Sequence, residues 1–135
     1  MRSLASVLSL ALVIVLAAAA QQKPAPKMKL TTYYLALLRR GPAWTPAQTP
    51  EVKRLQEAHM ANIQKMADEG KLVVAGPFGD NGELRGIFIF KVGSLAEAKA
   101  LCAEDPMVKA GRLTIEVHPW LTDGDLTVTP RSPSQ

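Results

Sequence analysis

GKLVVAGPFGDNGELRGIFIF, residues 70–90, is the stretch of sequence that decides the fold. Two runs rich in β-forming residues flank a segment rich in glycine. The dipeptide Asn81-Gly82 within that segment is typical of a type I′ hairpin turn. We therefore expect one strand over residues 72–75 and another over residues 83–92, paired in antiparallel fashion.

A helix is predicted on either side of this hairpin. Thr49-Pro50-Glu51 combines a hydroxyl N-cap, a proline at the first helical position and an acid in the first turn, and Gly70 ends that helix. Its apolar face comprises Val52, Leu55, Ile63, Met66 and Ala67. Ser94-Leu-Ala-Glu97 is a capping box that begins the second helix, and Asp105-Pro106 begins a further short helical turn closed by Gly111.

Strand patterns at residues 30–38 and 113–117 complete the order βαββαβ. This order suits a four-stranded antiparallel sheet with both helices on one face, the ferredoxin-like α+β arrangement. The predicted domain covers residues 29–121.

Alternation along the two hairpin strands predicts two apolar faces on the sheet. In the later strand one set comprises Leu84, Phe88 and Phe90, and the other Ile87 and Ile89. In the earlier strand one set comprises Leu72 and Val74, and the other Val73 and Ala75. Because helices cover only one face, we expect the other face to be covered by a second copy of the chain in a homodimer.

The first twenty residues have the pattern of a cleaved signal peptide. Arg2 is followed by an apolar run from Leu4 to Leu16 and by a small-residue cleavage site, Ala18-Ala19-Ala20. We expect residues 1–20 to be removed, residues 21–28 to be a linker and residues 122–135 to be a disordered tail. The mature chain would then be exported to the bacterial periplasm or secreted, with no membrane association. An uncleaved N-terminal anchor is the alternative.

Composition argues against nucleic acid as a partner. Without residues 1–20, 15 basic residues face 12 acidic ones, a formal charge of +3, and the basic residues are scattered. RNA-recognition modules share the βαββαβ order, but they need stacking aromatic residues where this chain has Ile87 and Ile89. Cys102 is the only cysteine, so no internal disulfide forms, and its place on an inward helix face indicates a core thiol.

His59 is the first candidate for chemistry. It falls in the middle of the apolar stripe of its helix, between Leu55 and Ile63. On the residues alone, it is either a core histidine whose ring is hydrogen-bonded or half of an acid–base pair. Asp80, after the second strand, is the candidate carboxylate, and a plain turn residue is the alternative reading.

Three further residues are candidates for binding a substrate. Arg85 is the basic residue nearest the hairpin and would hold an anion, unless it is a solvated strand arginine. Tyr34 lines a cavity or packs in the core, and Phe78 lies in the bend before Asp80. His118 is on a different strand, without acidic residues at ligand spacing, so we expect no metal and no cofactor.

From Tyr34 to Trp120 the chain resembles the YciI family, or YCII-related domain. The matching segments are residues 34–38, His59, residues 70–77, Asp80, Gly82, the strand into Phe88, residues 94–100, Asp105-Pro106, residues 109–111 and Pro119-Trp120. The chain departs from short members in its longer loop at residues 41–49 and in its signal peptide.

This resemblance implies a ferredoxin-like dimer in which two sheets form a shared α+β barrel. It implies a His–Asp catalytic pair, which carries over to His59 and Asp80. At least one relative is a dehydrochlorinase that acts on a chlorinated hydroxyquinol, and muconolactone isomerases share the wider fold. The resemblance thus favours a cofactor-free acid–base lyase or isomerase that acts on a small molecule of aromatic or lactone type.

Two other functions fit the same sequence. The cavity would serve a non-catalytic dimer that binds or senses a small ligand, or the chain would have only a structural pairing role. The sequence does not distinguish an enzyme from a binding protein. A measurement of product formation from a bound compound would distinguish them.

Overall fold

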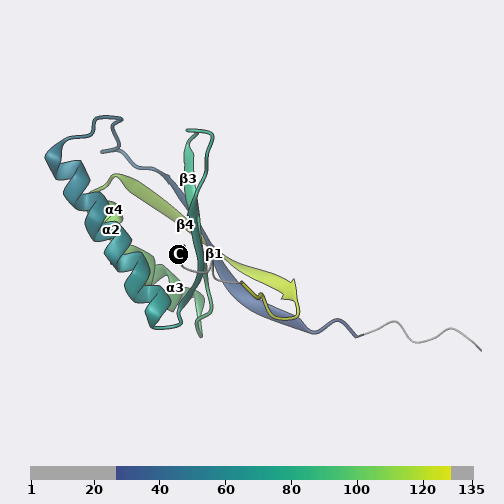
Figure 1. Ribbon diagram of the computed structural model, residues 1–135. Coiled ribbons are helices and arrows are strands. Elements are labelled where there is room, and N and C mark those ends of the chain that lie inside the picture. Colours follow the sequence, from purple (N-terminus) through teal and green to yellow (C-terminus); the bar gives the residue numbers. More distant parts are fainter. Residues whose placement is uncertain (1–26, 129–135) are drawn as a thin grey trace, which may run out of the picture.

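One antiparallel sheet with its helices on one side makes up the fold of the computed structural model, which describes residues 27–128 (Figure 1). The elements are β1 (Leu30–Arg40), α2 (Pro50–Asp68), β2 (Leu72–Pro77), β3 (Leu84–Phe90), α3 (Leu95–Ala103), α4 (Pro106–Lys109) and β4 (Leu113–Asp123). The strands lie in the order β2-β3-β1-β4, and every neighbouring pair is antiparallel. The predicted ferredoxin-like α+β fold is therefore confirmed. The predicted signal peptide, most of the predicted linker and residues 129–135 lie outside the described residues.

The predicted helix starts are present. The Thr49 hydroxyl accepts a hydrogen bond from the Val52 N–H at 3.2 Å, and Ser94 Oγ accepts from the Glu97 N–H at 3.1 Å. Glu97 in turn accepts from the N–H of Gly93 at 3.1 Å, whereas in a capping box it would accept from the N–H of the N-cap residue, Ser94. Each cap satisfies N–H groups that a helix start leaves without intrahelical partners. None of the helices within residues 27–128 is long and apolar enough to cross a membrane.

The hydrophobic core lies between the helices and the inner face of the sheet. Its buried members are Ala36, Leu38, Met66, Leu72, Phe88, Phe90, Ala98, Cys102 and Val117. Burial, assisted by the charge of Asp105, raises the pKa of the Cys102 thiol to about 12. Cys102 is therefore a core residue, as the sequence predicts, and its thiol stays protonated at neutral pH.

Two bulges change the predicted alternation of side chains. In the β1–β3 pair, Leu38 faces Gly86 but Arg39 faces Leu84, so Arg85 is an extra residue on β3. Because directly paired residues point to the same side, Leu84 lies on the outer face with Ile87 rather than with the core phenylalanines.

The second bulge lies in β2. Leu72 pairs with Phe90, but Val74 pairs with Ile89 and Ala75 with Phe88. The predicted faces of Val74 and Ala75 are thus reversed. Strict alternation misplaces them because one inserted residue exchanges the faces of everything beyond it.

The turn between β2 and β3 is not of the predicted type. It runs over residues 78–83, and Asn81 has a positive φ of 58° whereas Gly82 does not. A type I′ turn needs positive φ at both positions, so that prediction was wrong. The Asp80 carboxylate instead accepts a hydrogen bond from the Gly82 N–H at 3.1 Å, which closes an Asx turn.

The last strand also extends further than predicted. β4 continues to Asp123, which pairs with Leu30, so the predicted tail boundary at residue 122 falls inside the strand. Beyond it, the Leu126 N–H donates to the Tyr33 hydroxyl at 2.8 Å. Pro119 interrupts the sequence pattern, but an edge strand such as β4 tolerates a proline because one side of it is unpaired.

Candidate functional site

His59 and Asp105 form a buried pair at the interface of α2 and α4. His59 Nδ1 lies 2.7 Å from Asp105 Oδ2, and the Asp105 side chain is fully buried. The imidazole also stacks on Phe88, with ring centroids 6.0 Å apart. The ring is therefore fixed in orientation from two sides.

Asp105 is held by the local geometry of α4. It is the N-cap of this short helix, and its Oδ1 accepts from the Met107 N–H at 2.9 Å. Its other oxygen accepts from Asn62 Nδ2 at 3.2 Å in addition to His59. One carboxylate thus caps a helix and orients a histidine, and neither oxygen is left without a partner.

The charge state of Asp105 decides the tautomer of His59. Burial opposes the charged carboxylate, but the hydrogen bond and charge of His59, with the donors of Met107 and Asn62, outweigh it and hold the pKa of Asp105 below its ordinary value. An ionised carboxylate only accepts hydrogen bonds. Nδ1 of the neutral imidazole therefore carries the proton, and Nε2 keeps a free lone pair, the arrangement of a general base.

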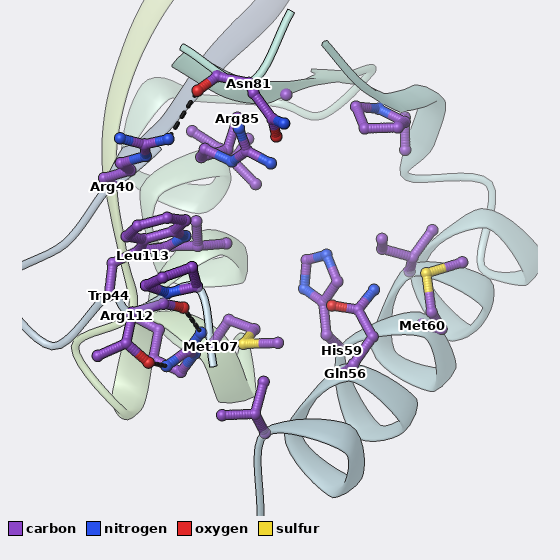
Figure 2. Close-up of a pocket in the computed structure, with 18 of the residues that line it drawn as sticks. Arg40, Trp44, Gln56, His59, Met60, Asn81, Arg85, Met107, Arg112 and Leu113 are labelled. Atoms are coloured by element: carbon purple, nitrogen blue, oxygen red, sulfur yellow. Dashed lines mark hydrogen bonds between the residues drawn. The ribbon is translucent and has the colours of Figure 1, made fainter. Parts of the chain in front are cut away.

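A cavity of about 780 Å³ lies beside this pair. His59 and Met60 of α2, Arg85 of β3, and Arg112 and Leu113 before and within β4 contribute to its walls. Figure 2 shows the imidazole of His59 projecting into this space, with Arg85 on the far side. The histidine thus presents its free edge to a space large enough for a small organic molecule.

The bulge in β3 explains why Arg85 reaches the cavity. Regular alternation would put Arg85 on the outer face with Ile87, but the extra residue turns it to the helix side. Arg40, which follows Leu38 by two residues on β1, also lines the cavity, and its guanidinium lies 3.9 Å from the ring centroid of Trp44.

The predicted partner of His59 was wrong. Asp80 is exposed and bonds to the Gly82 N–H, whereas His59 bonds to Asp105. The reason is topological, because the turn at residue 80 closes on itself while the start of α4 packs against the middle of α2. The alternative reading of Asp80 as a turn residue is the one that the geometry supports.

Only some of the predicted site residues lie at the cavity. His59 and Arg85 line the cavity, but Tyr34 and Phe78 do not. Tyr34 packs against the hydrophobic core, and Phe78 is 39% exposed.

Sequence reasoning missed Asp105, Arg40 and Arg112 as residues of the site. The available signal for Asp105 is the Asp105-Pro106 dipeptide, which predicts a helix start and matches a segment of the YciI family but does not indicate a partner of His59. Nothing in the pattern shows that this cap is buried. Among residues 27–128, no group of three His, Cys, Asp or Glu side chains is arranged to hold a metal ion.

Residues 32–121 match the family described as the YCII-related domain. Among solved structures, the chain is similar to the 5-chloro-2-hydroxyhydroquinone dehydrochlorinase TftG from Burkholderia phenoliruptrix AC1100, in complex with 2,5-dihydroxybenzoquinone. The TM-score is 0.50 at 22% identity, and the match covers 65% of this chain and 92% of that chain. At this identity the similarity concerns the fold. No curated protein sequence matches the chain.

Proposed function

The chain belongs to the YCII-related domain family, and from this premise we propose that it is an acid–base enzyme whose general base is His59. The observation that carries the proposal is the 2.7 Å contact between His59 Nδ1 and the buried Asp105, at the wall of a cavity of about 780 Å³. An imidazole placed in this way can take a proton from a bound molecule and return it.

The reaction begins at a C–H bond on the carbon beside a carbonyl group of the substrate, which a phenol presents in its keto tautomer. His59 Nε2 takes the proton, and the electron pair of the C–H bond moves into the ring system to form an enolate. Asp105 stabilises the resulting imidazolium and orients it. The imidazolium then returns the proton to another carbon, which is an isomerisation, or the enolate expels a leaving group, which is an elimination.

The substrate is a small molecule of aromatic or lactone type. The cavity has apolar walls at Val52, Ile63 and Leu113, which suit a ring. The fold neighbour is a dehydrochlorinase of a chlorinated hydroquinone, and its reaction is an elimination. A lyase or isomerase reaction on such a ring therefore fits both the cavity and the fold.

The same proposal includes a homodimer formed through the outer face of the sheet and export of the mature chain. The outer face carries Leu35, Leu37 and Ile87, which are half-buried in one copy of the chain. A two-fold axis would bury this surface in both copies at once.

The test is exchange of substrate protons with solvent. The chain is incubated in D₂O with 2,5-dihydroxybenzoquinone, chlorinated hydroquinones and unsaturated lactones, and ring protons are followed by NMR. We expect at least one compound to lose C–H signal through catalysis, and His59→Asn to abolish the exchange because no other base faces the cavity in the part of the chain described.

Asp80→Asn is the matched control, since asparagine keeps the oxygen that accepts from Gly82. It should leave exchange unchanged. Saturable binding of a compound without any exchange would instead support the non-catalytic binding or sensing dimer. Exchange that survives in His59→Asn would overturn the assigned base.

A further inference from the structure

Positive charge dominates the polar part of the cavity. Three arginines, Arg40, Arg85 and Arg112, line it, and no Asp or Glu is among the lining residues. A cleft lined by charges of one sign concentrates ligands of the opposite sign. The question is then which of the three guanidinium groups is available to a ligand.

Arg112 holds the loop before α2. Its Nη1 donates to the carbonyl oxygen of Ala43 at 3.3 Å, and its Nη2 donates to that of Thr45 at 2.9 Å. Figure 2 shows the Arg112 side chain at the floor of the cavity, turned toward this loop. Both terminal nitrogens of its guanidinium group thus bind the backbone of residues 43–45.

The two Nη groups of Arg40 are committed as well, and only its buried Nε has no hydrogen-bond partner within residues 27–128. Its Nη1 pairs with Glu83 Oε1 at 3.3 Å, and its Nη2 donates to the Asn81 carbonyl at 2.6 Å. The guanidinium also packs over Trp44, at 3.9 Å from the ring centroid. Arg40 therefore ties the hairpin turn to β1 and contributes a partly neutralised charge.

Arg85 differs from both. Its one hydrogen bond within residues 27–128 is from Nη1 to the Gly82 carbonyl at 3.3 Å, and none of the ion pairs of this region involves it. The bulge in β3 directs this side chain into the cavity although neighbouring alternation would place it outside. Arg85 thus presents unused N–H donors to the cavity, across from His59.

We propose that the substrate carries a carboxylate group, and that Arg85 binds this carboxylate while His59 faces the reacting carbon. The planar guanidinium matches a carboxylate with two parallel hydrogen bonds, a geometry that a neutral phenol or quinone oxygen does not use fully. The apolar wall of Val52, Ile63 and Leu113 then contacts the ring that bears the acid. This inference rests on the proposed function only in taking His59 as the base.

The same geometry aids the reaction. An enolate formed beside the bound carboxylate adds negative charge, and three arginines around the cavity offset the repulsion between the two anionic groups. A cavity without these charges would disfavour the ionised intermediate of an acidic substrate.

The test is equilibrium binding, which needs no turnover. Isothermal titration calorimetry at low salt compares 2,5-dihydroxybenzoate with 2,5-dihydroxybenzamide, and a five-membered lactone bearing an acetate side chain with its primary amide. At least one acid should bind about tenfold tighter than its amide, as expected for charge-assisted hydrogen bonds. Arg85→Gln should remove this preference, and Arg85→Lys, which keeps the charge but not the fork, should retain part of it.

Arg39→Gln is the matched control. Arg39 precedes Arg40 in the chain but does not line the cavity, and its Nε pairs with Glu116 Oε2 at 3.5 Å. This variant should bind the acids as the unchanged protein does, and circular dichroism should show every variant folded. Equal affinity for acid and amide, equal effects of the two glutamine variants, or no binding of any acid at millimolar concentration would each overturn the proposal.

The two proposals fail separately. His59→Asn should keep the preference for acids while it loses proton exchange. Binding that depends on Arg85 without exchange of any compound would contradict the acid–base enzyme and leave the ligand class standing. Proton exchange of neutral substrates that is unchanged in Arg85→Gln would contradict the carboxylate-bearing substrate and support the acid–base enzyme.

Discussion

At the scale of single residues, Asp105 is the position on which the candidate site depends most. It is fully buried, and its two oxygens serve a helix cap and a histidine. A buried carboxylate is costly unless every lone pair finds a donor, and here the Met107 N–H, Asn62 and His59 supply them. Loss of the charge would therefore affect both stability and the orientation of His59.

Asp105→Asn should lower the free energy of unfolding by about 1.5–3 kcal/mol at pH 7, as hydrogen bonds to charged groups do. Because the pKa of Asp105 is lowered from its ordinary value of 3.8, its ionised form stabilises the fold above that pH. This stabilisation is lost as the pH falls through the pKa of the folded state. The difference in the free energy of unfolding between the unchanged protein and Asp105→Asn should thus be largest near neutral pH and should shrink below pH 3.8.

Urea unfolding between pH 3 and pH 7 measures this difference, and Asp80→Asn is the control that should show little effect at any pH. A constant difference between Asp105→Asn and the unchanged protein across the whole range would contradict the assignment. It would mean that the ionised carboxylate contributes nothing specific to the fold.

At the scale of elements, the β2–β3 ribbon is what shapes one side of the cavity. Gly86 follows the bulged Arg85, and a Cβ at Gly86 would lie 2.6 Å from the Gly76 carbonyl oxygen and 3.3 Å from Pro77 Cα. The close approach of the two strands therefore requires a residue without a side chain at this position. The bulge and the glycine together allow an arginine to turn inward where the strands meet.

Gly86→Ala should destabilise the protein by about 1–3 kcal/mol, the usual cost of forcing an extra methyl group into packed backbone. Gly79→Ala is the matched control in the same ribbon, since nothing lies within 4 Å of a Cβ there. Thermal and urea unfolding of both variants measure the effect. Equal stability of the two would mean that the strands separate without cost, and that the close contact does not hold the ribbon.

At the scale of the whole molecule, the helices cover one face of the sheet, and the other face is covered only in part. On that outer face Tyr33 and Ile89 are buried, but the side chains around Leu37 are half-buried. Phe88 and Phe90 pack beneath the helices, whereas Leu35 and Leu37 lie on the other side with Ile87. Apolar side chains in a contiguous patch of this kind usually mark an interface. The homodimer proposed above would cover it.

Sedimentation at micromolar concentration should therefore give twice the chain mass. Leu37→Glu should shift the protein to a monomer, because a charge would be buried without a partner in the interface. Lys99→Glu, on the exposed side of α3, introduces the same acid away from the sheet and should leave the dimer intact. A folded monomer at every concentration would contradict the proposed interface.

The sequence alone determined the order of the elements, the helix caps and the place of His59 on the inner face of α2. These features depend on residues close together in the chain, where propensity, capping and periodicity act directly. The family could be inferred as well, because its motifs are local segments in a fixed order.

Only the tertiary structure decided which carboxylate meets His59 and which arginine faces the cavity. His59 and Asp105 are 46 residues apart, so their contact depends on how α4 packs against α2 rather than on either segment by itself. The nearer candidate, Asp80, satisfies its own turn. Arg85 turns inward because of one bulged residue, and a bulge arises from the pairing of β3 with β1, which no pattern within β3 reveals.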